Sequence, residues 1–152
     1  MVALAAVALW IMVGTDPREP GAAEVSTAVA TPASNGESGA IYLVIDNAGT
    51  SDQLLAVEVD GAERASIHRM TEAAGTEVME EMDLLEISAG ETVAMAPGEM
   101  HVMADDIKND WVPGDRLAVD LRFRDAGAVK IEVPVVDYVE LADRLSEDDR
   151  PS

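Results

Sequence analysis

The sequence contains no cysteine and few aromatic or basic residues. Its 152 residues include two Trp, two Tyr and one Phe, and 10 Lys and Arg stand against 30 Asp and Glu. The absence of cysteine excludes thiolate catalysis, disulfide bonds, zinc–thiolate sites, iron–sulfur clusters and blue-copper electron transfer. The formal net charge of −20 argues against nucleic acid as a partner, because phosphate binding needs clustered Lys and Arg.

The sequence does have enough apolar residues to fold. Apolar residues make up 48% of the chain, and its length predicts one domain with a hydrophobic core. The acidity has two interpretations. We favour adaptation to high salt over the steering of cations or a basic partner, because charge pattern alone is weak evidence for a specific partner.

The first residues differ in character from the rest. Residues 1–15 open with an uncharged apolar run that is shorter than the roughly 20 residues needed to span a bilayer. No basic residue precedes this run, so we expect a signal or membrane-anchor segment that is truncated. Residues 16–39, rich in Pro, Gly, Ser, Thr and Ala, predict a flexible linker. These segments predict an extracytoplasmic protein, in the periplasm or on the outer face of the cytoplasmic membrane, anchored or secreted. Without cysteine, lipid attachment through these residues is excluded.

The body of the chain, residues 40–137, consists of short alternating runs separated by turn signals. We expect seven to nine strands in an antiparallel β-sandwich. A short helix and an acidic, disordered tail are expected over residues 138–152. The runs that carry this prediction are 41–45, 54–59, 91–95, 99–103, 117–123 and 129–135, with a hairpin turn at 125–127.

The unusual residues are two histidines and eight methionines. His68 and Met70 stand two residues apart, as do His101 and Met103, so each pair can point to one face of a strand. Met79 lies between the two pairs. Imidazole and thioether are soft ligands, and this set favours Cu(I) over zinc or harder cations.

These residues also fit a structure without metal. Methionine in a β-sandwich is a common core residue. Met95 is expected in the core, and Met100 is expected to point away from His101. Met70 and Met82 fit either interpretation, so the residue pattern alone leaves metal binding open.

The spacing of these residues resembles the periplasmic copper chaperone family called PCuAC. That family has a histidine, ten intervening residues, a methionine, twenty-one more, and then His-x-Met, as His68, Met79, His101 and Met103 do here. The segments IYLVIDNAG, SIHRM, SAGETVAMAPGEMHVM, WVPGDRLAVDLRF and AGAVKIEVPV also resemble the family, in the expected order. The similarity covers about residues 40–136.

The resemblance implies a cupredoxin-like Greek-key β-sandwich without enzymatic activity. It implies that Cu(I) binds to His68, Met79, His101 and Met103. The family commonly has the pattern Val-Met-x-Met at this point, with one residue between the two methionines. Here two residues, Glu80 and Glu81, separate Met79 from Met82. Met82 is therefore a substitute candidate for the third ligand.

The resemblance also implies a function. The family delivers copper outside the cytoplasm, typically to the copper-bearing subunit of cytochrome c oxidase, sometimes with a Sco-type protein. Two alternatives remain open: a copper storage or resistance protein, and an exported β-sandwich interaction module without metal.

Overall fold

The protein consists almost entirely of β-strands. The structure, a computed structural model, describes residues 21–147. Within them ten strands are followed by one helix: β1 (Ala23–Ala30), β2 (Gly39–Asn47), β3 (Asp52–Val59), β4 (Ala62–Ala73), β5 (Thr76–Met82), β6 (Leu85–Ile87), β7 (Thr92–Ala94), β8 (Met100–Ile107), β9 (Arg116–Phe123), β10 (Gly127–Pro134) and α2 (Tyr138–Glu147).

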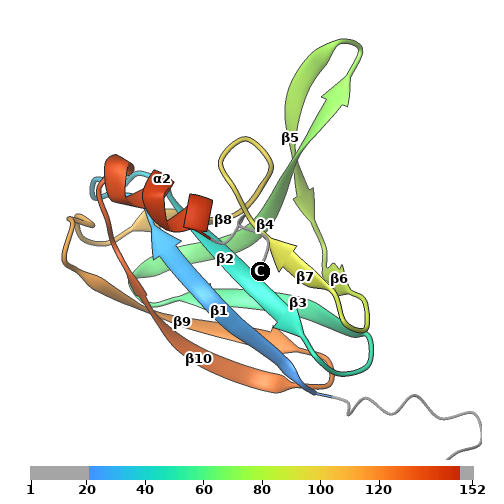
Figure 1. Cartoon of the computed structure of the whole chain (residues 1–152). Coiled ribbons are helices and arrows are strands. Elements are labelled where there is room, and N and C mark those ends of the chain that lie inside the picture. The colour runs from blue at the N-terminus through green and yellow to red at the C-terminus, as the bar shows by residue number, and fades with distance from the viewer. Residues whose placement is uncertain (1–20, 148–152) are drawn as a thin grey trace, which may run out of the picture.

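The strands form two antiparallel sheets (Figure 1). The first sheet has the order β1-β2-β8-β4-β5, with β7 also paired to β2, and the second has the order β10-β9-β3-β6. All pairings between these strands are antiparallel. The predicted antiparallel β-sandwich is therefore confirmed, but residues 21–147 form ten strands rather than the seven to nine expected. Some neighbouring strands, such as β2 and β8, are distant in sequence.

Alternation along the strands builds the core between the sheets. In β9 the alternate residues Leu117, Val119, Leu121 and Phe123 are buried, as the sequence pattern predicts. In the first sheet, β2 contributes Ile41, Leu43 and Ile45, none of which is exposed to solvent. One face of the first sheet is thus fixed to the core, and the residues in between face outward.

The linker predicted over residues 16–39 is wrong for its described part. Ala23–Ala30 forms β1, which pairs with β2 along most of its length, and Val29 and Ala30 are completely buried. The alternation in β1 is masked by small residues and by a register shift between Val25 and Thr27, which breaks the period of two. The folded domain therefore includes residues from Ala23 onward and not only those from residue 40.

The remaining predictions for the termini are tested in part. Helix α2 is present where a short helix was expected. The apolar segment 1–15 and the tail 148–152 lie outside the described residues. Within residues 21–147, no helix has both the length and the apolar character needed to cross a membrane.

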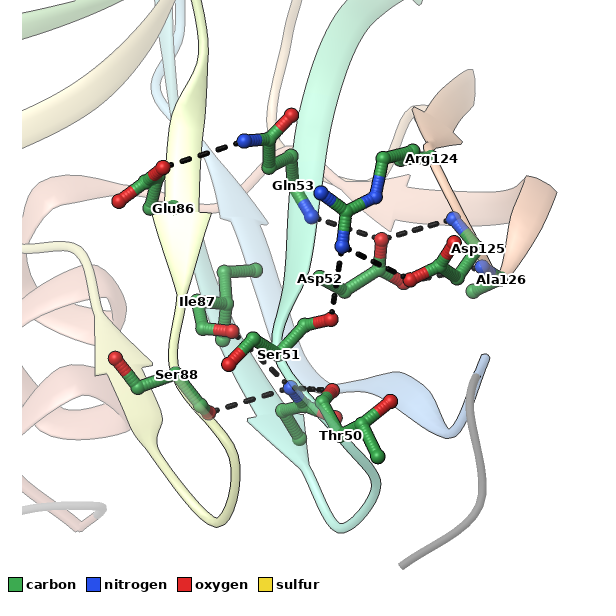
Figure 2. Close-up of polar contacts among 11 residues, drawn as sticks. Thr50, Ser51, Asp52, Gln53, Glu86, Ile87, Ser88, Arg124, Asp125 and Ala126 are labelled. Atoms are coloured by element: carbon green, nitrogen blue, oxygen red, sulfur yellow. Dashed lines mark hydrogen bonds and ion pairs between the residues drawn. The ribbon is translucent and has the colours of Figure 1, made fainter. Parts of the chain in front are cut away.

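A buried carboxylate ties the turns of the second sheet together (Figure 2). Asp52, only 2% exposed, accepts hydrogen bonds from the backbone N–H groups of Gln53 at 2.8 Å, Asp125 at 2.9 Å and Ala126 at 3.0 Å. Arg124 donates to the Ser51 carbonyl at 3.1 Å beside it. These bonds satisfy donors of the β9–β10 turn, so we interpret this polar cluster as structural.

Candidate metal centre

The predicted ligands lie on three neighbouring strands of the first sheet. In the register of β4 and β8, His68 is opposite His101 and Ser66 is opposite Met103. In the register of β4 and β5, Met70 is opposite Met79. Because directly opposed residues point to the same side of a sheet, all of these side chains lie on one face. Val102 and Ile67, their neighbours in sequence, are buried in the core, so this is the outer face.

The two histidines lie side by side. Their ring centroids are 5.7 Å apart and the rings are nearly parallel, with an interplanar angle of 15°. His101 is 7% exposed. Burial, and secondly the positive charge of His68, lower the pKa of His101 below its ordinary value of 6.5. Both effects favour the neutral imidazole of His101, which is the form that can bind a metal ion.

His68 has one nitrogen with no partner. Its Nε2 lies 2.7 Å from the Ser66 hydroxyl, whereas its Nδ1 is buried and makes no hydrogen bond. In the part of the chain that the structure describes, no other buried side-chain nitrogen is left without a partner. Unpartnered buried polar atoms are rare in proteins and often mark a bound ion or a functional role.

The two predicted thioether ligands differ in position. Met103 is half-buried, two residues from His101 on the same strand. Met79 is 48% exposed on β5, the edge strand of the sheet, in the projecting β4–β5 hairpin (Figure 1). From the strand spacing and rise, its Cα lies about 12 Å from that of His101. The structure therefore gathers His68, His101 and Met103, and places Met79 on the same face at the exposed side.

The remaining methionines within residues 21–147 separate into two groups. Met82 is opposite Ile67 and packs against the core, so its proposal as a substitute ligand is wrong. Met95 is 1% exposed in the core, and Met100 also packs against the core, as expected. Met70 lies on the outer face beside Met79 and remains a candidate.

Two neighbours of the histidines were not found from the sequence. The ring of Tyr42 lies 6.3 Å from that of His101, and Ser66 contacts His68. Burial, with a smaller effect of Tyr138, raises the pKa of Tyr42 above its ordinary value. Alternation places Tyr42 on the outer face of its strand, but only the pairing of β2 with β8 brings it near His101.

Carboxylates lie beside the histidines, but within the described residues they do not form a metal-binding cluster. Glu81 is opposite His68 and forms an ion pair with Arg64. Glu72 and Glu77 face each other near the hairpin turn. Nowhere in residues 21–147 do three or more His, Cys, Asp or Glu side chains gather as they would around a metal ion. A metal bound at the histidines would therefore need the thioethers.

Comparison with known proteins identifies the family. The family described as "Putative lipoprotein LpqE-like" matches residues 23–135. The chain belongs to this LpqE-like family. A relative named as a putative lipoprotein, from Leifsonia xyli subsp. xyli, is 28% identical over 125 residues, which cover 82% of this chain and 75% of that protein.

Solved structures show the same fold as this LpqE-like protein. The apo PCuAC domain from PmoF1 is 26% identical, with a TM-score of 0.63, over 78% of this chain and 97% of that domain. The copper-bound PCuAC domain from PmoF2 is 22% identical, with a TM-score of 0.65, over 81% and 99%. An apo protein of Deinococcus radiodurans, solved in solution, is 20% identical, with a TM-score of 0.53, over 84% and 91%.

These matches confirm two interpretations of the sequence. The PCuAC resemblance is correct, and the fold is the cupredoxin-like β-sandwich of that group. The family and the matched structures are described as a lipoprotein and as PCuAC domains, and these descriptions name no enzymatic activity.

Proposed function

We propose that the protein is an extracytoplasmic metallochaperone that binds Cu(I) and delivers it to the copper site of a respiratory oxidase. The observation that carries this proposal is the histidine pair, in which a buried nitrogen of His68 has no partner. The thioether of Met103 stands beside this pair on the same face. The proposed ligands are His68, Met79, His101 and Met103.

The donor set suits Cu(I). Neutral imidazole and thioether are soft ligands, and thioether sulfur binds hard divalent cations weakly. Zinc sites are usually completed by thiolate or carboxylate. The sequence has no cysteine, and the carboxylate of Glu81, which is opposite His68 in the β4–β5 pairing, forms an ion pair with Arg64.

The position of the ligands favours transfer over storage. The site lies on the outer face of a sheet, and Met79 is nearly half exposed at the sheet edge. A partner could therefore replace this thioether first and then take the ion by stepwise ligand exchange. A site closed on all sides would release copper more slowly.

The comparisons support copper as the cargo. The PCuAC domain from PmoF2 carries copper in its solved structure, and its fold covers most of this chain. By resemblance, we propose the copper-bearing subunit of cytochrome c oxidase, or a Sco-type protein, as the acceptor.

The location proposed for the protein is outside the cytoplasm. The family description and the Leifsonia relative both name a lipoprotein, a class of protein held at the outer face of a membrane. The 152 residues contain no cysteine to which a lipid could be attached. We propose that residues 1–15 are a signal or membrane-anchor segment.

The proposal is tested by Cu(I) titration of the full chain in competition with a chromogenic chelator. We expect one tightly bound Cu(I) in the wild type, weaker binding in His101→Ala and Met103→Leu, and a folded domain in both variants. Met100→Leu is the matched control, because it removes a thioether that faces the core next to His101. Equal affinity in all four proteins would place the site elsewhere.

Delivery needs a second measurement. The loaded protein is mixed with the soluble copper-binding domain of an oxidase subunit, and the copper in each protein is measured after separation. Transfer supports the chaperone, whereas tight binding without transfer supports a storage or resistance protein. An apo protein that ignores Cu(I) supports an interaction module without metal.

A further inference from the structure

Ser66 is the only hydrogen-bonding partner of the His68 ring in the described structure. Its side chain lies on the outer face of β4, two residues before His68, and Ser66 is only 8% exposed. The Ser66 Oγ lies 2.7 Å from Nε2 of His68, which is a short, well-formed hydrogen-bonding distance. The other ring nitrogen, Nδ1, is buried and has no partner.

We infer that Ser66 positions His68 for copper, by accepting a hydrogen bond from Nε2–H and leaving the Nδ1 lone pair to bind the ion. This inference rests on the proposed function, because it names the nitrogen and the supporting residue of the same site. It assigns a role to Ser66 that neither the motif nor the resemblance gives.

A neutral imidazole ring exists in two forms that differ in which nitrogen carries the proton. One nitrogen carries a proton and donates, and the other has a lone pair and accepts. If the Ser66 hydroxyl donated to Nε2, the proton would sit on Nδ1 as a buried donor without an acceptor. If Nε2–H donates to Ser66, Nδ1 holds a lone pair that a cuprous ion can satisfy. Only the form with the proton on Nε2 leaves the buried, unpartnered Nδ1 able to bind a metal ion.

The surroundings leave His68 no second polar partner. On the β5 side its neighbour is Glu81, whose carboxylate is held by Arg64. On the β8 side its neighbour is the ring of His101, stacked at 5.7 Å. Rotation of the ring is therefore limited by packing, and the choice of tautomer is left to Ser66.

The backbone fixes Ser66 in turn. Ser66 is directly opposite Met103 in the β4–β8 pairing. The strand pairing that fixes the position of the proposed ligand Met103 therefore also fixes the position of the Ser66 hydroxyl. Partners of this kind, which hold a metal-binding histidine by its second nitrogen, typically change metal affinity by about 10- to 100-fold when removed.

The test compares Ser66→Ala and Ser66→Thr with the wild type in the full chain. Long-range nitrogen–proton NMR of the imidazole ring reports the tautomer of His68 in the apo protein and the copper-bound nitrogen after Cu(I) is added. We expect the Nε2–H tautomer in the apo wild type and copper on Nδ1 when loaded. We expect Ser66→Ala to mix the tautomers and to weaken Cu(I) binding about 10- to 100-fold, and Ser66→Thr to restore both.

The control is Ser26→Ala, which removes a strand hydroxyl from β1, away from the histidines, and should leave tautomer and affinity unchanged. An Nδ1–H tautomer in the wild type, copper on Nε2, or wild-type affinity in Ser66→Ala would each overturn the inference. A folded wild type that fails to bind Cu(I) would instead overturn the proposed function, and the apo tautomer would then decide whether Ser66 sets the ring.

Discussion

The assignment of β1 to the folded domain can be tested at Val29. This side chain is completely buried, although it lies in a segment whose composition is typical of a linker. It is opposite Tyr42 in the β1–β2 pairing, on the same outer face as the histidines. Val29→Ala therefore tests both the strand and the support of the Tyr42 ring beside His101.

The expected magnitude follows from the burial. Val29→Ala removes two carbon groups, each worth about 0.8 kcal/mol of transfer free energy, or about 1.6 kcal/mol in total. The cavity that remains raises the loss to about 2 kcal/mol or somewhat more, because packed neighbours relax only partly. With a urea m-value of about 2 kcal/mol per molar, the midpoint of unfolding should fall by about 1 M.

The assay is urea unfolding of the apo protein followed by circular dichroism. Glu24→Ala is the matched control on the same strand, because its side chain is exposed and its loss should change the free energy of unfolding by less than about 0.5 kcal/mol. If Val29→Ala is no more harmful than Glu24→Ala, the segment is a linker after all and the domain begins near residue 40.

Three further results are expected. Asp52→Ala should lower the free energy of unfolding by roughly 2–4 kcal/mol, because the N–H groups of the β9–β10 turn lose their acceptor; a loss below about 1 kcal/mol in urea unfolding would contradict this. Met79→Leu should weaken Cu(I) binding at least about tenfold in chelator competition, whereas Met82→Leu should not, and the reverse order would refute the register of β5. The His101 ring protons should titrate by NMR with a midpoint below 6.5, and a midpoint above it would refute the burial of that ring. Because the folded pKa is the lower one, the apo protein should be fully stabilised by this group above pH 6.5 and lose that stability as the pH falls.

Much of the site can be predicted from the sequence because it depends on which residues of one strand share a face, and that follows from their spacing along the chain. A residue two positions away on a strand points to the same face, so His101 and Met103 must lie together. The alternation in β9 likewise predicts which residues are buried. These statements need no knowledge of which strands are neighbours.

The rest depends on strand pairing, and part of that could have been predicted. Ala74 and Gly75 form the β4–β5 turn with positive φ angles of 53° and 79°. Counting outward from a two-residue turn pairs Met79 with Met70 and sends Met82 to the core face, so the turn excludes Met82. The pairing of β4 with β8 has no such local signal, because the two strands are separated by three others in sequence. The positions of Ser66 and Tyr42 beside the histidines therefore become visible only in the structure.

The exposure of Met79 has a consequence for the proposed copper site under oxidising conditions. Oxidants convert methionine to its sulfoxide according to access, and Met79, at 48% exposed, is far more accessible than the fully packed Met95. The sulfoxide is a polar oxygen donor and no longer a soft ligand for Cu(I). Oxidation of this one side chain at the sheet edge would thus remove a ligand from the proposed copper site, and a methionine sulfoxide reductase would restore it.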